Sequence, residues 1–354
     1  MLKKMKIAML LFAPIALYGL YVIGVIIFGT VTNYSPDAEI DITAENVSSR
    51  VATDSTFTFM IWNVGYGGLG AESDFFYDGG KMVRPEEGIV SQYVDGINEF
   101  LETEKETDFI LLQEVDIDSK RSYGTNEFAA FGKTLGTHER AHALNYKVKY
   151  VPMPLTTVSP MGKVHSGLAT YSKYQSENTT RYQFPGNYGW PKSVFMLDRC
   201  FLIQRIPHEN GKEIIVINSH NSAYDDGTLK IQQMEYMKDI LLTEYEKGNY
   251  VIVGADWNQC PPDFAFDSFS SGNSDGYAQT NIEADFLPEW QWVFDDSVPT
   301  NRKLSTPYTK GETFVTLIDF FLVSPNVKVE NVEGVDLDFK YSDHQPVKMK
   351  ISLL

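Results

Sequence analysis

Six groups of polar side chains follow or begin short apolar runs in this sequence, and their types could do acid–base or metal chemistry. They are Asn63, Glu114, Asn218 with His220, Asp256 with Asn258, Asp319, and Asp343 with His344. One such group alone predicts little, since a polar residue after a strand usually forms a turn or caps a helix. All six carry carboxylate, amide or imidazole groups, and oxygen ligands without a cysteine cluster suit Mg²⁺, Mn²⁺ or Ca²⁺ rather than structural zinc.

The last group, Asp343-His344, lies close to the end of the sequence, and Pro346 leads from it into the apolar run 347–354. Adjacent residues on an extended chain point to opposite sides. One of the pair can therefore meet a metal ion while the other meets a substrate atom, provided that other segments supply partners.

The elements that must position these groups alternate between apolar runs and amphipathic segments from residue 56 onward. We expect strands at 57–62, 109–112, 167–171, 200–206, 213–218, 250–253 and 318–323, and helices at 86–105 and from 228 to about 247. The strands at 200–206 and 213–218 are separated by a turn at Gly211 and need a hairpin. The sequence therefore predicts one α/β domain over residues 56–354, built on mixed rather than purely parallel sheets.

The first residues form a separate unit. Lys3, Lys4 and Lys6 precede an uncharged run from Ile7 to Phe28, which exceeds the ~20 apolar residues that cross a bilayer. We expect residues 1–29 to be a transmembrane anchor with the basic flank in the cytoplasm and the rest of the chain outside. A cleaved signal peptide is the alternative, although its apolar region is usually ~7–15 residues.

Residues 30–55 are polar and are predicted to be a linker, with an ordered strand at 38–42 as the alternative. The chain has 354 residues and a formal net charge of -17. That charge argues against a protein that binds nucleic acid mainly by neutralising phosphates, but not against one that binds phosphates through a cation. Cys200 and Cys260 lack metal-site spacing, and the sequence leaves open whether they pair.

Seven segments together resemble the endonuclease/exonuclease/phosphatase superfamily, which includes DNase I-like nucleases, inositol-polyphosphate 5-phosphatases and neutral sphingomyelinases. They occur in the family's order: Trp62-Asn63-Val64, Leu112-Gln113-Glu114-Val115, Ser166-Gly167-Leu168-Ala169-Thr170-Tyr171-Ser172-Lys173, Asn218-Ser219-His220, Gly254-Ala255-Asp256-Trp257-Asn258, the run from Ile318-Asp319 to Ser324, and Ser342-Asp343-His344-Gln345-Pro346-Val347. The resemblance spans residues 57–354. It implies a four-layer α/β sandwich of two mixed β-sheets flanked by helices, and metal-assisted hydrolysis of a phosphate ester.

The resemblance also implies roles for individual residues. Glu114 matches the family's principal metal ligand, and Asn63 and Asp343 match positions near the same ion, most simply Mg²⁺, with Mn²⁺ or Ca²⁺ as alternatives. The resemblance predicts that the carboxylate of Asp343 faces Glu114. It also predicts that His344 faces Asp319, which would fix the tautomer of the imidazole.

Catalytic roles fall to His220, Asp256, Asn258, Asp319 and His344. Asp256 and Asn258 would orient a water molecule and a phosphate oxygen, while the two histidines would act as acid, base or phosphate clamp, with the order left open. Asn218, Lys173 and Arg199 are expected to bind substrate. Lys173 stands where many members carry arginine, and Arg199 either compensates for that change or forms a surface ion pair.

These expectations combine into a membrane-anchored, metal-dependent phosphoesterase that hydrolyses a phosphodiester or phosphomonoester outside the cytoplasm. The substrate is a nucleic acid, a phospholipid head group or a small phosphoester, and nothing in the sequence calls for an obligate protein partner. An extracellular DNase I-like nuclease and a sphingomyelinase- or phospholipase C-like enzyme are the alternatives. A binding module that kept the fold without the chemistry is a further alternative, disfavoured because Glu114, Asp256 and His344 are all present.

Overall fold

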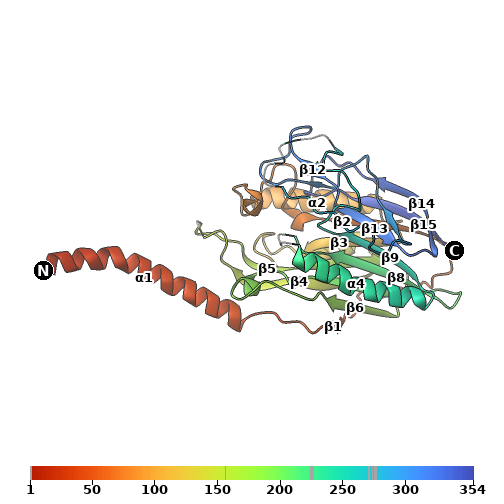
Figure 1. Cartoon of the computed structure of the whole chain (residues 1–354), viewed down its shortest axis with the longest axis horizontal. Helices are drawn as coiled ribbons and strands as arrows, with labels where there is room; N and C mark the ends of the chain where they lie inside the picture. The colour runs from red at the N-terminus through yellow and green to blue at the C-terminus, as the bar shows by residue number, and fades with distance from the viewer. Residues whose placement is uncertain (1, 156, 224–226, 270–271, 273, 275–276) are drawn as a thin grey trace.

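Two mixed β-sheets lie face to face at the centre of the domain, with helices on their outer faces (Figure 1). A computed structural model of the chain describes residues 2–155, 157–223, 227–269, 272, 274 and 277–354, with the backbone alone for residues 2–12. The four-layer sandwich that the family resemblance implies is confirmed.

The first sheet has seven strands and the second has six. In spatial order the first contains β1 (Glu39–Asp41), β6 (Asn178–Gln183), β7 (Cys200–Pro207), β8 (Glu213–His220), β9 (Tyr250–Asp256), β13 (Asp319–Val323) and β10 (Gln291–Val293). The second contains β14 (Val327–Gly334), β15 (Val347–Leu353), β2 (Thr56–Asn63), β3 (Phe109–Asp116), β5 (Gly162–Ser172) and β4 (Glu139–Val151). A short pair, β11 (Asn301–Arg302) and β12 (Val315–Thr316), lies apart.

The helices of the domain are α2 (Glu87–Thr103), α3 (Glu127–Thr134) and α4 (Thr228–Glu246). Three short 3₁₀ helices, η1 (Gly65–Gly67), η2 (Phe76–Asp78) and η3 (Lys192–Phe195), lie in the connecting loops. The hairpin predicted between the strands near 200 and 213 is confirmed, because β7 and β8 pair antiparallel. The long strand β4 was not predicted, since its inward alanines give a weak apolar pattern.

Strand alternation explains the layers. Phe59 and Ile61 on β2 point into the core between the sheets, whereas Met60 and Trp62 point outward to the core beneath α2 and α3. In the same way Ile252 on β9 lies between the sheets, while its neighbours on that strand pack against α4. Each such fully buried side chain contributes roughly 1.5–3 kcal/mol of transfer free energy.

The parallel pairs bring strand ends to one edge of each sheet. β2 pairs parallel with β3 through the crossover helix α2, and β8 pairs parallel with β9 through α4. β13 runs antiparallel to β9 and starts at that same edge, where Asp319 is registered with Asp256. The directions of the strands alone therefore place the polar groups at one end of the sandwich.

The N-terminal helix α1 (Leu2–Val31) extends away from the domain (Figure 1). Its segment Ala13–Val31 is long and apolar enough to cross a membrane and is only 11% buried. Within the predicted linker 30–55, residues 39–41 form β1 and pair with β6, which is the ordered alternative considered from the sequence. Cys200 and Cys260 are both free and buried.

Candidate active site

Asp256 is the polar group on which the site converges. It ends β9, is 1% exposed, and lies opposite His220 of β8 and Asp319 of β13 in the strand register. One of its oxygens, Oδ2, accepts a hydrogen bond from Asn63 Nδ2 at 2.9 Å and lies 3.2 Å from His220 Nε2. Burial alone would raise the pKa of Asp256, but the two histidines outweigh burial and lower it, so the carboxylate is ionised.

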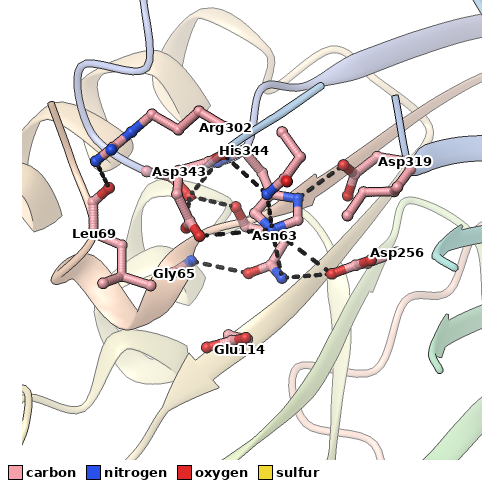
Figure 2. Close-up of polar contacts among 12 residues, drawn as sticks. Asn63, Gly65, Leu69, Glu114, Asp256, Arg302, Asp319, Asp343 and His344 are labelled. Carbon is pink, nitrogen blue, oxygen red and sulfur yellow. Dashed lines mark hydrogen bonds and ion pairs between the residues drawn. The ribbon is translucent and has the colours of Figure 1, made fainter. Parts of the chain in front are cut away.

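Asp319 and His344 form a hydrogen-bonded pair beside it. His344 Nδ1 lies 2.8 Å from Asp319 Oδ2, and Figure 2 shows the imidazole between this carboxylate and Asp256. Burial alone lowers the pKa of His344, but the nearby carboxylates, led by Asp319, outweigh burial and raise it well above 6.5. The second nitrogen of the imidazole, Nε2, lies 3.0 Å from Asn301 Nδ2 and faces the pocket side of the pair.

His220 is in a different electrostatic state from His344. Burial, reinforced by the guanidinium of Arg199, lowers the pKa of His220 well below 6.5. The pKa values of the two imidazoles near the same carboxylate are thus shifted in opposite directions. Pairs of titratable groups whose environments separate their pKa values are typical of acid–base sites.

Glu114 reaches the pocket because β3 is irregular at that residue. The β3–β5 register shifts between Leu112 and Val115, and Glu114 has a φ of 56°, which is uncommon for a residue other than glycine. The bulge turns the carboxylate out of the sheet while Val115 remains in the core. Glu114 is among the residues that line the pocket, and its Oε2 lies 3.7 Å from Arg121 Nη1.

Asn63 and Asp343 complete the oxygen donors. Asn63 Oδ1 accepts a hydrogen bond from Gly65 N at 3.0 Å, which fixes the amide (Figure 2). Gly65 has a φ of +52°, and a Cβ at that position would lie 2.8 Å from Asp343 Oδ1, so glycine is required there. Burial raises the pKa of Asp343 to about 7, and the negative charge of Glu114 acts in the same direction. Asp343 and Glu114 both line the pocket.

Two donor sets in this site could hold a cation. Glu114, Asp343 and Asn63 supply hard oxygen atoms, and the repulsion between two carboxylates there is the kind that a divalent cation relieves. Ligand atoms of Asp256, Asp319 and His344 also lie within 4.8 Å of one another. In that second set the Asp319–His344 hydrogen bond already engages Nδ1 of the imidazole and one oxygen of Asp319. The first set therefore fits a divalent cation better.

The pocket around these groups has a volume of about 720 Å³, within the range of small-molecule sites. Glu114, His220, Asp256, Asn258, Asp343 and His344 line it, with Arg199 and Arg121 on the same wall. Asn258 is held by its own strand end: its N–H donates to Asp256 Oδ1 at 3.0 Å, and its Nδ2 donates to Asn221 O at 3.1 Å. Asn258 therefore braces the Asp256 carboxylate from the outer side.

Two residues expected to bind substrate lie elsewhere. Asn218 is completely buried between the sheets, where its amide bonds Gln113 of β3 and Thr170 of β5. Lys173 follows β5, which runs antiparallel to β3, so it lies at the opposite end of the sandwich and its Nζ binds Glu106. Asn218 is a connector between sheets, and Lys173 is a surface ion pair remote from the pocket.

Three site residues were not predicted from the sequence. Arg121 is held by Asp116 through Nε and Nη2 at 3.2 and 3.0 Å, and its guanidinium carbon lies 3.6 Å from the centre of the Tyr66 ring. Asn301 contacts His344, as described above. Arg302 Nη2 donates to the carbonyls of Leu69, Gly70 and Ser73 at 2.8 to 3.1 Å, and its backbone N–H donates to Asp343 O at 3.0 Å. Asn301 and Arg302 lie outside every predicted site segment, so no local signal marked them.

Comparison with known protein families matches residues 60–344 to a family described as the Endonuclease/Exonuclease/phosphatase family. A solved endonuclease/exonuclease/phosphatase from Beutenbergia cavernae has a TM-score of 0.59 at 17% identity and covers 85% of this chain and 72% of its own. TDP2 from D. rerio, complexed with a single-strand DNA product, has a TM-score of 0.53 at 13% identity and covers 84% of this chain and 100% of its own. The human nocturnin catalytic domain with bound sulfate anion has a TM-score of 0.53 at 13% identity and covers 86% of this chain and 96% of its own. The similarities to these three solved structures show the fold alone. Comparison with curated proteins gives no match.

Proposed function

Because the chain belongs to the endonuclease/exonuclease/phosphatase family, we propose that it is a phosphoesterase that uses a divalent cation, is anchored in a membrane by α1, and acts outside the cytoplasm. One observation supports this proposal most directly. Polar groups from four of the six segments, namely Glu114, His220, Asp256 with Asn258, and Asp343 with His344, line one pocket, and the pKa values of the two histidines beside Asp256 are shifted in opposite directions. A binding module that had lost its chemistry would have no need of this arrangement.

Glu114 and Asp343 would hold the cation, with Asn63 beside them. When bound, Mg²⁺ would polarise the phosphoryl oxygens and offset the charge that develops on them. The mutual repulsion of the two carboxylates supports this assignment, since it lowers the cost of binding a positive ion there. Mn²⁺ and Ca²⁺ have the same preference for oxygen ligands.

The remaining groups would handle the phosphate and the proton. Asp256 is ionised and is positioned by Asn63 and Asn258, so it can orient an attacking water molecule and accept its proton. His344, protonated and oriented by Asp319, can bind a non-bridging phosphate oxygen. His220 lies on the other side of Asp256 and can exchange a proton near the leaving-group oxygen.

The charge around the pocket supports an anionic substrate. Five of its lining residues are Lys or Arg and four are Asp or Glu, whereas the whole chain has 30 basic and 47 acidic residues. The pocket lining thus has a small excess of basic residues, in contrast to the acidic chain as a whole. The alternatives are a nuclease, supported by the DNA product in the TDP2 structure, and a sphingomyelinase- or phospholipase C-like enzyme, supported by the apolar helix α1.

The full chain in detergent or nanodiscs should be assayed with Mg²⁺ on bis-p-nitrophenyl phosphate, plasmid DNA, sphingomyelin vesicles and phosphoinositide vesicles. We expect hydrolysis of at least one substrate, its loss with EDTA and its restoration by excess Mg²⁺. His344→Ala should be inactive at unchanged melting temperature. Silence on every substrate in the presence of metal would refute the enzyme proposal. Protease added to intact cells should remove the domain, and full protection would contradict its placement outside.

A further inference from the structure

The hairpin that joins β4 to β5 lies against α1. Tyr150, one residue before the end of β4, has its hydroxyl 2.9 Å from the hydroxyl of Tyr21 in α1. Earlier in the same strand, Lys147 Nζ lies 4.8 Å from the ring centre of Tyr34, which follows the helix. As β4 advances from 147 to 150, its partners move from residue 34 back to residue 21. β4 therefore runs down along α1 toward the N-terminus of the helix, and Figure 1 shows β4 and β5 on the side of the domain that α1 adjoins.

This direction fixes the depth of the hairpin if α1 spans a membrane. Any ~20-residue span within the uncharged run 7–28 has its outer edge at residues 26–28. Tyr21 lies five to seven residues below that edge, which is about 8–10 Å along a helix. Tyr150 is at the same level as Tyr21. The loop after the last β4–β5 pair, Val151 with Gly162, therefore lies at or below the level of the lipid head groups.

The composition of the loop suits that depth. Residues 151–162 contain no charged residue, whereas Lys147, Lys149 and Lys163 flank them. Among the described residues of this loop, Val158 is fully exposed and Leu155 is half exposed, while Val151 and Met161 pack into the domain and hold its base. Exposed apolar side chains flanked by lysines are typical of segments that enter the interface of a bilayer with anionic lipids.

A second segment lies near the outer edge of the span itself. Trp190 is 65% exposed, and its Nε1 donates to Thr30 Oγ1 of α1 at 3.1 Å. Tryptophan is enriched at the boundary between hydrocarbon and water. A water-facing domain surface would gain nothing from exposing Trp190, Leu155 and Val158 together, whereas a bilayer would cover all three.

We propose that Leu155, Val158 and Trp190 form a membrane-docking surface that enters the outer leaflet of the same bilayer that α1 crosses, with Lys147 and Lys149 at the head groups. This inference rests on the proposed membrane anchor. It deepens the proposed function, because Tyr146 and Met161 of the hairpin and Tyr188 near Trp190 also line the active-site pocket. The docked pocket lies beside lipid head groups, which favours a phospholipid among the three substrate classes.

The test uses the full chain with single added cysteines, labelled with an environment-sensitive nitrobenzoxadiazole dye and reconstituted into vesicles of neutral and anionic phospholipids. The native Cys200 and Cys260 are 0% and 1% exposed and so should not take the label. Val158→Cys reports the docking surface and Ile15→Cys reports α1. Leu354→Cys is the control, because the C-terminus lies on the far side of the domain from α1 (Figure 1).

We expect lipid-borne nitroxide to quench the dye at Val158→Cys and at Ile15→Cys, and aqueous iodide to quench it only at Leu354→Cys. At Val158→Cys a nitroxide near the head groups should quench more strongly than one near the chain end, since interfacial insertion reaches only ~5–10 Å. Iodide quenching at Val158→Cys equal to that of the control would overturn the inference while leaving the anchor intact. Protection from both quenchers would show a protein contact and would also overturn it. Loss of lipid quenching at Ile15→Cys would refute the anchor itself.

Discussion

Replacing Asp319 with asparagine isolates the electrostatic contribution of the pair it forms with His344. Asp319 begins β13 and is 1% exposed, and its Oδ2 lies 2.8 Å from His344 Nδ1. Asparagine keeps the size of the side chain and one acceptor oxygen but removes the charge. Since the strand register and the core beneath it are unchanged, the substitution should leave the fold intact.

The expected magnitude follows from the hydrogen bond. A bond to a charged partner contributes ~1.5–3 kcal/mol, and the neutral replacement recovers only part of it in one of two amide orientations. If His344 must be protonated and correctly oriented in the transition state, a loss of about 1.5–3 kcal/mol lowers kcat/KM roughly 10- to 150-fold. The same free energy lowers the pKa of His344 by about one to two units, because burial then opposes the charge with less compensation.

The assay measures kcat/KM on bis-p-nitrophenyl phosphate with Mg²⁺ and follows the His344 ring by NMR across the neutral pH range. Asp338→Asn is the matched control, because it removes a surface carboxylate that pairs with Lys310 away from the pocket. We expect the control to behave as wild type in both measurements. Wild-type kcat/KM in Asp319→Asn, together with an inactive His344→Ala, would show that Asn301 alone orients the imidazole and would refute the reasoning.

Four further changes test other parts of the structure. Mg²⁺ at 100 times its Kd should raise the free energy of unfolding of the wild type by about 2.7 kcal/mol, as measured by thermal unfolding. Glu114→Gln should abolish most of this stabilisation. Arg121→Lys keeps the charge but loses the paired bonds to Asp116, so kcat/KM should fall about 10-fold or more at similar stability; unchanged kinetics would remove Arg121 from the site. Arg302→Met leaves buried carbonyls of the loop after η1 unpaired and should lower the free energy of unfolding by about 3 kcal/mol. Burial alone would raise the pKa of Glu244, but hydrogen bonds led by Arg205 lower it to about 2, so its stabilisation is present above pH 4.5 and is lost as the pH falls toward 2. Solvent weakens this contribution, because Arg205 is 23% exposed. Between neutral and acid pH, the free energy of unfolding should therefore fall by about 1–2 kcal/mol more in wild type than in Glu244→Gln. An equal fall in both proteins would contradict the assignment.

The apolar runs of the sequence predict the central strands and mixed sheets, and the resemblance to the family implies the four-layer sandwich. The sequence also locates most of the polar groups, because parallel strands joined by helices must end at one edge. Asn218 shows the limit of this reasoning. It points to the same side of β8 as His220, but His220 is the last residue of the strand, whereas Asn218 lies two residues inside it. Only His220 extends past the core into the pocket, while Asn218 remains between the sheets.

Other features depend on contacts that no local pattern shows. The left-handed backbone of Glu114 follows from a bulge against β5, and nothing in the run Leu112-Gln113-Glu114-Val115 predicts that bulge. Arg302 bonds a loop that lies more than 200 residues earlier in the chain, and a lone arginine in a polar stretch is usually a surface residue. Lys173 was expected at the site because it stands where many family members carry arginine, whereas antiparallel pairing carries the end of β5 away from the site.

The geometry of the site therefore depends on how closely the two sheets pack. Asn63 comes from one sheet and Asp256 from the other, yet their side chains are 2.9 Å apart. Two residues before Asp256, Gly254 faces the other sheet, and a Cβ there would lie 2.4 Å from Ile61 Cγ2. A glycine at this position lets the backbones approach, and the approach brings the amide of Asn63 within reach of the carboxylate. The hydrophobic core between β2 and β9 thus sets the distance on which the polar network depends, which is why the fold and the chemistry cannot be varied independently in this chain.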